Sequence, residues 1–158
     1  MKPYPASAVH NIVIAGHNGV GKTTLVSGLL HEAGAVSRFG RVEDGTAPTD
    51  FDPEEIERKI SIGLAVAALE WKKHKINLID TPGYADFLGD VEAALDVADL
   101  VVFVISAVDG VEVQTEIIWK LAAKANVPRM FFLNKLDRER ASFERTLDEI
   151  RTKFGAGV

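Results

Sequence analysis

The stretch GHNGVGKT, Gly16 to Thr23, constrains the fold of this chain more than any other feature. It fits the pattern G-x-x-x-x-G-K-[ST], follows the β-rich run VHNIVIA and opens into the helical run TLVSGLL. In such a strand–loop–helix unit, glycines let backbone N–H groups surround phosphate oxygens, and the helix N-terminus adds partial positive charge. The alternative is a glycine-rich turn that only caps a helix. The flanking strand and helix favour a phosphate-binding loop.

Two side chains of this loop have specific expected roles. We expect Lys22 to reach the β- and γ-phosphates of a nucleotide and the Thr23 hydroxyl to ligate Mg²⁺. We expect His17 to act in phosphate binding through its main-chain N–H rather than through its ring. The ring is therefore not expected to be catalytic. Further phosphate contacts are expected from the other loop residues and the next threonine: Gly16, His17, Asn18, Gly19, Val20, Gly21 and Thr24.

Five β-rich runs alternate with helical patterns along the chain. Strands are predicted at Val9 to Ala15, Ile60 to Trp71, Lys75 to Asp80, Leu100 to Ser106 and Arg129 to Asn134. The last two runs are almost continuously apolar, as expected for strands covered by helices on both faces. The turn at 72–74 leaves no room for a crossover helix, so the two strands that it joins should be antiparallel. The pattern predicts a three-layer α/β domain with a mostly parallel sheet and one antiparallel strand.

Apolar side chains at helical spacing predict the helices between these strands. They run from Phe87 to Ala98, from Ile117 to Ala125 and from Phe143 to Phe154. A further short helix should begin at Pro53, with Asp52 as its cap and acidic residues in its first turn. The apolar stripes of these helices predict core packing.

Composition limits the class of protein. The 158 residues, 47% of them hydrophobic, suffice for a single domain over 1–158 with a proper core. The absence of cysteine excludes a disulfide framework and makes a reducing cytoplasm the default location. The longest apolar run, Leu100 to Ile105, is too short to span a membrane. A net charge of -5 argues against a nucleic-acid clamp.

The sequence NKLD, Asn134 to Asp137, follows the last predicted strand. The Asp137 carboxylate can accept hydrogen bonds from guanine N1–H and N2–H₂, which adenine does not offer. Two bonds of about 1.5–3 kcal/mol each give a preference on the order of 10²–10⁴ for guanine. Asn134 should bridge the phosphate loop and the base, and the Lys135 stem should pack on the base face. NKLD therefore disfavours an ATP-using P-loop kinase.

A D-x-x-G sequence, Asp80 to Gly83, follows the third predicted strand. Asp80 is placed to hold Mg²⁺ through a water molecule, and the Gly83 N–H to touch the γ-phosphate. That contact exists with GTP and disappears with GDP, so the loop should be a two-state element. The three motifs in this order predict a switch domain that binds GTP or GDP with Mg²⁺.

Four longer stretches resemble the G domain of elongation factor G, the translocation GTPase of the ribosome. They are FGRVEDGTAPTDFDPEEIERKISI, DTPGYADF, SAVDGVEVQTE and FFLNKLDRERASF, and the resemblance extends from about Ile12 to Phe154. It implies a P-loop GTPase fold, GTP hydrolysis, and the ribosome as partner of the full-length protein. It also implies a first switch ending at Ser61, which stands in place of the usual threonine. Its hydroxyl would join Thr23 and Asp80 as a Mg²⁺ ligand.

The chain departs from the family at three positions. Gly19 replaces an aspartate, Lys59 replaces a glycine, and Tyr84 replaces the histidine that places the attacking water. Tyrosine, with a pKa near 10, cannot carry the charge that histidine can. We therefore expect tight nucleotide binding and weak hydrolysis, with Lys22, Gly83 and Tyr84 as the catalytic set. The combination of DTPGY with GHNGVGKT resembles the elongation factor G type 2 subgroup.

The family continues beyond RTKFGAGV with a further strand, an inserted subdomain and a Ser-Ala loop that backs the guanine. We therefore expect a C-terminally incomplete fold with an exposed sheet edge, which invites dimerisation. Two alternatives remain open. One is a GTP/GDP-binding module with negligible hydrolysis, and the other is the G domain of a tetracycline-resistance ribosomal protection protein.

Overall fold

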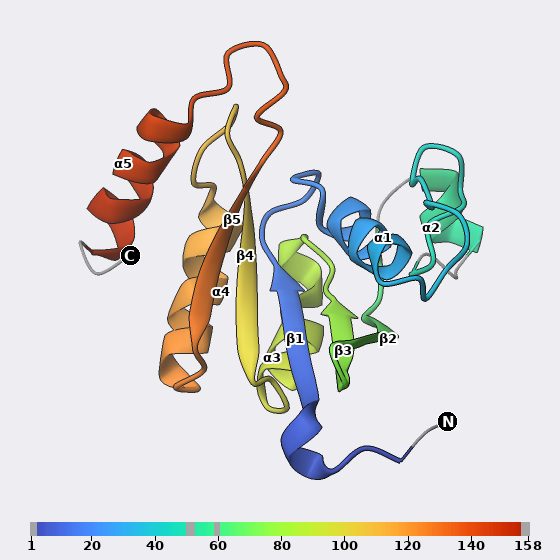
Figure 1. Ribbon diagram of the computed structural model, residues 1–158. Helices are drawn as coiled ribbons and strands as arrows, with labels where there is room; N and C mark the ends of the chain where they lie inside the picture. The colour runs from blue at the N-terminus through green and yellow to red at the C-terminus, as the bar shows by residue number, and fades with distance from the viewer. Residues whose placement is uncertain (1–2, 50–52, 59–60, 156–158) are drawn as a thin grey trace.

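The computed structural model describes residues 3–49, 53–58 and 61–155. Five strands alternate with helices in the order that the sequence predicts (Figure 1). The strands are β1 Val9–Ala15, β2 Ala65–Trp71, β3 His74–Asp80, β4 Leu100–Ser106 and β5 Arg129–Asn134. The helices are α1 Lys22–Glu32, α2 Pro53–Arg58, α3 Leu88–Leu95, α4 Val113–Lys124 and α5 Phe143–Phe154, with short 3₁₀ turns at Ala6–Ala8 and Ala85–Phe87.

The strands form one sheet in the order β2-β3-β1-β4-β5. β1 is parallel to both β3 and β4, and β4 is parallel to β5. β2 runs antiparallel to β3, with Trp71 opposite His74, which confirms the antiparallel pair expected from the short connection. The two residues of that turn, Lys72 and Lys73, both have positive φ, as a two-residue hairpin of type I′ requires.

The sheet lies between two helical layers (Figure 1). Alternate side chains of β1 and β4 point to opposite faces, since successive residues of a strand alternate. Val13 and Phe103 pack with α3 and α4, whereas Ile14 and Val104 pack with α1. At the β5 side, Phe154 of α5 joins a cluster of packed aromatic rings, stacked on Phe131 and tilted against Trp119. The predicted three-layer α/β fold is thus confirmed.

The predicted start of the second strand was wrong. An apolar run suggested a strand from Ile60, but β2 begins at Ala65. The N–H groups of Ile62 and Gly63 donate to the Glu55 carboxylate at 2.8 and 3.1 Å, so these donors are engaged outside the sheet. The predicted cap Asp52 and the switch residue Lys59 lie outside the described residues.

The helix predicted from Phe87 to Ala98 is shorter than expected. A 3₁₀ turn covers Ala85–Phe87, and α3 then extends only over Leu88–Leu95. α4 begins at Val113, four residues before the predicted Ile117, and α5 has the predicted bounds. The element types agree with the sequence prediction, and the differences concern helix ends.

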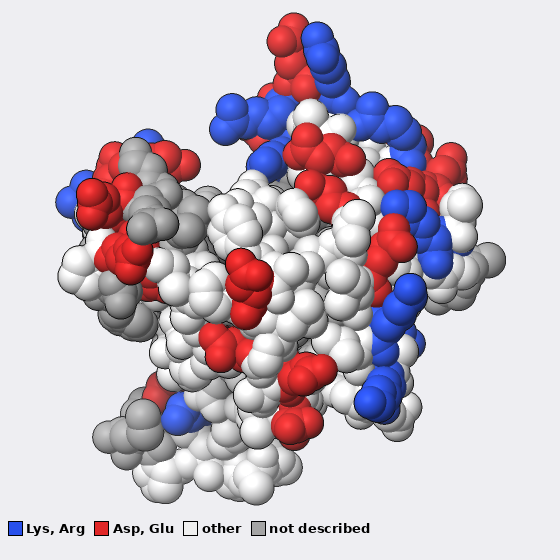
Figure 2. All heavy atoms as spheres, turned by 180° about the vertical axis from the view of Figure 1, so that it is seen from behind, with Lys and Arg blue, Asp and Glu red and all other residues white. Residues whose placement is uncertain are grey.

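The outer face over α3 and α4 carries no continuous basic stripe among the described residues. Figure 2 shows carboxylates scattered across this face, with lysine and arginine gathered at the top and along one side. No helix in the described part of the chain has the length and apolar character needed to cross a membrane.

Candidate functional site

The phosphate loop joins β1 to α1 and depends on glycine backbone geometry. Gly16, Gly19 and Gly21 have positive φ values of 143°, 72° and 96°. A Cβ atom on Gly16 would meet the Val104 carbonyl oxygen, so this position also needs the small side chain. α1 begins without a side-chain cap, which leaves the N–H groups of its first turn free to bind an anion.

Lys22 is buried at the centre of this loop. Its Nζ donates to the His17 carbonyl oxygen at 2.9 Å, and 6% of the residue is exposed. Burial lowers the pKa of Lys22 to about 8, although the charges of Asp80 and Glu112 oppose the shift. An anion beside this ammonium would stabilise its charged form.

Three oxygen-bearing side chains predicted to ligate Mg²⁺ meet at the N-terminus of α1. Thr23 Oγ1 donates to Asp80 Oδ2 at 2.8 Å and lies 3.1 Å from Ser61 Oγ. They come from α1, from the end of β3 and from the segment before β2. The structure therefore brings together residues that are up to 57 positions apart.

Asp80 is almost completely buried, and its environment suits a hard cation. Burial raises the pKa of Asp80, and the Thr23 hydrogen bond and the Lys22 charge oppose the rise. Asp80 Oδ1 has no hydrogen-bond partner among the described residues, although it is buried. A buried carboxylate oxygen without a partner is costly, and Mg²⁺ prefers hydroxyl, carboxylate and water oxygens. These residues therefore fit Mg²⁺.

Two further residues of this region were not predicted. Thr49 is buried and donates through Oγ1 to Asp80 Oδ2 at 3.0 Å. Glu55, predicted only as an acidic first-turn residue of α2, is buried and accepts the N–H groups just after Ser61. Neither residue belongs to a motif, and a threonine in a loop gives no periodic signal of burial.

The predicted base-recognition loop lies beside the phosphate loop. Asn134 Nδ2 donates to the Val20 carbonyl oxygen at 2.9 Å, so the end of β5 is tied to the loop before α1. Lys135 has a positive φ of 58°, and its Nζ lies 3.9 Å from Asp109 Oδ2. The side chain of Asp137 is 82% exposed and lies 3.8 Å from Arg138 Nε. Its carboxylate is thus open to an incoming base.

The loop after β3 lies directly against the phosphate loop. A Cβ atom added to Gly83 would lie 2.6 Å from both Asn18 N and Lys22 Nζ. The next residue, Tyr84, is half-buried, and its hydroxyl accepts a hydrogen bond from Asn18 Nδ2 at 2.7 Å. The structure therefore places the tyrosine hydroxyl on a phosphate-loop side chain.

The imidazole of His17 makes a separate contact. Its Nε2 lies 3.2 Å from Glu112 Oε1 at the start of α4. Burial raises the pKa of Glu112, and His17 opposes that rise. The side chain of His17 therefore contacts a carboxylate of the neighbouring loop.

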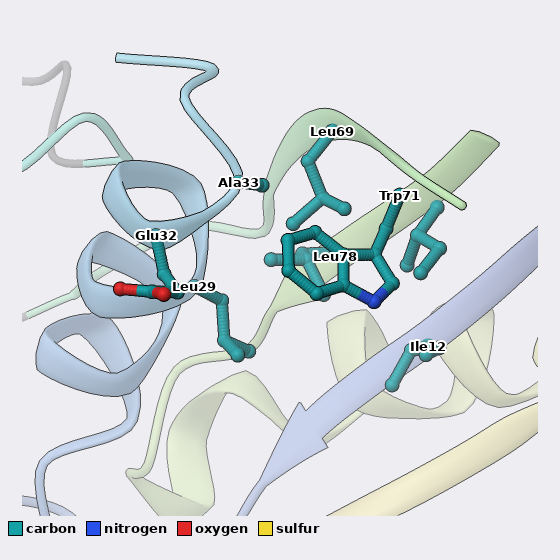
Figure 3. Close-up of a pocket in the computed structure, with 8 residues that line it drawn as sticks. Ile12, Leu29, Glu32, Ala33, Leu69, Trp71 and Leu78 are labelled. Atoms are coloured by element: carbon teal, nitrogen blue, oxygen red, sulfur yellow. The ribbon is translucent and has the colours of Figure 1, made fainter. Parts of the chain in front are cut away.

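The described residues enclose two hollows near α1. A cavity of about 270 Å³ is lined by the phosphate loop together with Thr24, Val42, Glu43 and Ser61. A second cavity, of about 210 Å³, lies between α1 and the sheet and is lined mainly by apolar side chains such as Leu29, Leu69 and Trp71 (Figure 3). Of these two, only the first is lined by phosphate-loop residues, so it is the candidate site for the phosphates of a nucleotide.

Comparison with known families matches residues 7–157 to the family described as the elongation factor Tu GTP binding domain. The chain is 45% identical over 153 residues to the mitochondrial ribosome-releasing factor 2 of Candida dubliniensis, covering 97% of this chain and 19% of that protein. It is 44% identical over 150 residues to an elongation factor G-like protein of Mycobacterium tuberculosis, covering 95% and 21%.

Among solved structures, a crystal structure of a Thermus thermophilus protein is similar, with a TM-score of 0.90 and 38% identity. The match covers 95% of this chain and 23% of that one. The chain thus spans about a fifth of the length of the curated relatives that it matches.

Proposed function

This chain belongs to the elongation factor Tu GTP binding domain family, and from that premise we propose that it is the nucleotide switch of an elongation factor G-like GTPase of the type 2 subgroup. It binds GTP and GDP together with Mg²⁺. The whole chain acts as one GTP-binding domain, and the ribosome is the partner of the protein in which it works. The cytoplasm is its proposed location.

The observation that carries this proposal is the contact of Thr23 with both Ser61 and Asp80. It joins the phosphate loop, the first switch and the D-x-x-G loop around one set of hard oxygen donors. Mg²⁺ held there would neutralise charge on the β- and γ-phosphates. Lys22 and the N-terminus of α1 would bind the phosphates, and Asn134, Lys135 and Asp137 would bind the guanine.

We expect hydrolysis to be weak. Water attacks the γ-phosphorus, the bond between this phosphorus and the β–γ bridging oxygen breaks, and GDP and phosphate leave. The reaction depends mainly on positioning and electrostatics. By the family resemblance Tyr84 would orient the attacking water, yet its hydroxyl already accepts a hydrogen bond from Asn18. This contact also favours the alternative of a binding module with negligible hydrolysis.

A single-turnover experiment tests binding and hydrolysis together. The chain is loaded in Mg²⁺ with γ-labelled GTP or ATP, retained nucleotide is counted, and phosphate release is timed with and without ribosomes. We expect retention of GTP and not ATP, slow release by the wild type, and roughly 10- to 100-fold faster release by Tyr84→His. The matched control is Tyr4→His, which alters the other tyrosine of the chain.

Each result of this experiment has a definite meaning. Equal retention of ATP would contradict guanine recognition. Unchanged release by Tyr84→His in both conditions would show that position 84 is incidental to hydrolysis. Undetectable release by the wild type over many hours would favour the non-hydrolysing module.

We also propose that two copies associate through β5. This strand has β4 on one side, and no other strand of the described residues pairs with its second edge. Met130 and Phe132 of β5 are exposed large apolar side chains. Unpaired backbone groups beside exposed apolar side chains favour edge-to-edge pairing.

A further inference from the structure

We propose that Asn18 is a specificity-determining residue of the nucleotide site, acting through Tyr84. Its side-chain amide holds the Tyr84 hydroxyl, and this bond keeps Gly83 against the phosphate loop. The arrangement favours a nucleoside diphosphate over a triphosphate. The inference rests on the proposed function, because it assigns a role within the same site.

The side chain of Asn18 is not needed for phosphate binding. Phosphate loops bind their ligand mainly through backbone N–H groups and the lysine. The amide of Asn18 instead donates to Tyr84 Oη at 2.7 Å, between residues 66 positions apart in the chain. Both residues are half-buried, so their hydrogen bond is partly protected from competition by water.

Gly83 lies where a terminal phosphate would have to be accommodated. An added Cβ atom would be 2.6 Å from Lys22 Nζ and equally close to the backbone nitrogen of Asn18. Of these two nitrogens, Lys22 Nζ is the donor that reaches the β- and γ-phosphates in a loop of this kind, whereas the backbone N–H groups surround the α- and β-phosphates. A methyl group on Gly83 would meet both nitrogens, so Gly83 is packed closely against the Lys22 ammonium. A third phosphate that enters between Gly83 and the Lys22 ammonium would therefore displace Gly83.

Displacement of Gly83 also moves its neighbour Tyr84. Because Tyr84 is tied to Asn18, the hydrogen bond opposes the entry of the third phosphate and leaves a diphosphate unaffected. A ligand shifts a two-state element only by its different affinities for the two states. Loss of the bond should consequently improve triphosphate binding relative to diphosphate binding.

A double-mutant cycle tests the inference. The variants are Tyr84→Phe, which removes only the hydroxyl, Asn18→Ala, and the two combined. Dissociation constants for GDP and for a non-hydrolysable GTP analogue are measured at fixed Mg²⁺. We expect each single variant to raise the preference for the triphosphate by about 2- to 10-fold, the range of one hydrogen bond. The double variant should equal either single variant, because the bond is already lost.

The chain offers a matched control in its other tyrosine. Tyr4→Phe removes a hydroxyl that hydrogen-bonds to Glu70, far from the site in the fold, and should leave the preference unchanged. Circular dichroism and thermal unfolding verify that each variant is folded. If Asn18→Ala is unfolded, Asn18→Ser replaces it in the cycle. If Tyr84→Phe is unfolded, Asn18→Ala and Asn18→Ser alone must show the shift toward the triphosphate, and its absence overturns the inference.

The outcomes separate the inference from the proposed function. A wild type that binds neither nucleotide overturns both. The wild type could bind both nucleotides while the variants lose GDP and triphosphate affinity equally. This result overturns only the role of Asn18 in specificity, because the hydrogen bond to Tyr84 would then be purely structural. Additive effects in the double variant, or a shift toward GDP, overturn it as well.

Discussion

Lys22 combines a buried position with a charge that the proposed function requires. Its Nζ is bonded to the His17 carbonyl oxygen, and burial lowers its pKa to about 8. In the unfolded chain the pKa of lysine is about 10.4. Bound phosphate needs the ammonium form, so folding and nucleotide binding favour different protonation states of the same group.

This conflict predicts opposite pH dependences. Between about pH 8 and 10 the unfolded state holds more protons on Lys22 than the folded state, so its contribution to the free energy of unfolding increases with pH. Over the same range GDP affinity should fall as the ammonium deprotonates. Denaturant unfolding and GDP titration at several pH values measure both quantities.

Lys22→Met provides the comparison for the unfolding experiment. The rise in unfolding free energy assigned to Lys22 should be missing from this variant. If the wild-type GDP affinity stays constant up to pH 10, or if the variant retains the whole rise, Lys22 does not have the assigned pKa.

Residues of the candidate site differ in how well the sequence predicts them. Thr23, Asp80 and Asn134 occupy motif positions whose residue types follow from phosphate, cation and base chemistry. Thr49 contacts Asp80 although the two residues are 31 positions apart in the chain, and no spacing rule describes such a contact. From the sequence, Glu55 is expected only to be an acidic residue in the first turn of a helix. In the structure its carboxylate accepts hydrogen bonds from the N–H groups of Ile62 and Gly63.

Elements buried on both faces are the most predictable. The apolar run of β4 has the predicted bounds because every residue after Leu100 is buried. β2 begins later than its apolar pattern suggests because two backbone donors before it are engaged by Glu55. Hydrophobic pattern identifies a strand, whereas its first residue depends on backbone hydrogen bonds made elsewhere in the fold.

β5 lies at one edge of the sheet, where a second copy could pair with it. Met130→Lys should lower self-association, because a charge on an edge strand opposes pairing with a second copy. Sedimentation over a range of protein concentrations measures the association. Val66→Lys is the matched control, since Val66 is 55% exposed on β2, the strand at the opposite edge.

Either of two results would contradict association through β5. A wild type that remains monomeric at all concentrations would exclude the dimer under those conditions. Loss of association only in Val66→Lys would place the contact on β2.

At the scale of the whole molecule, topology brings the motifs together. β1, β3, β4 and β5 all run in one direction, so the loops at their carboxyl ends meet at one edge of the sheet. The Asn134–Val20 and Asn18–Tyr84 hydrogen bonds connect these loops. The order of motifs predicts this convergence, but the direct bond between Asn18 and Tyr84 depends on side-chain packing that the sequence does not reveal.

Guanine recognition through Asp137, as proposed above, is tested by a specificity exchange. Xanthine has a carbonyl where guanine has its 2-amino group, and asparagine supplies an N–H donor where aspartate has only acceptors. Calorimetric titrations compare the wild type with Asp137→Asn for GDP, xanthosine diphosphate and ADP in Mg²⁺. We expect Asp137→Asn to lose GDP affinity by a factor on the order of 10²–10⁴ and to gain xanthosine diphosphate binding. Unchanged GDP affinity in Asp137→Asn, or equal binding of ADP and GDP by the wild type, would contradict it.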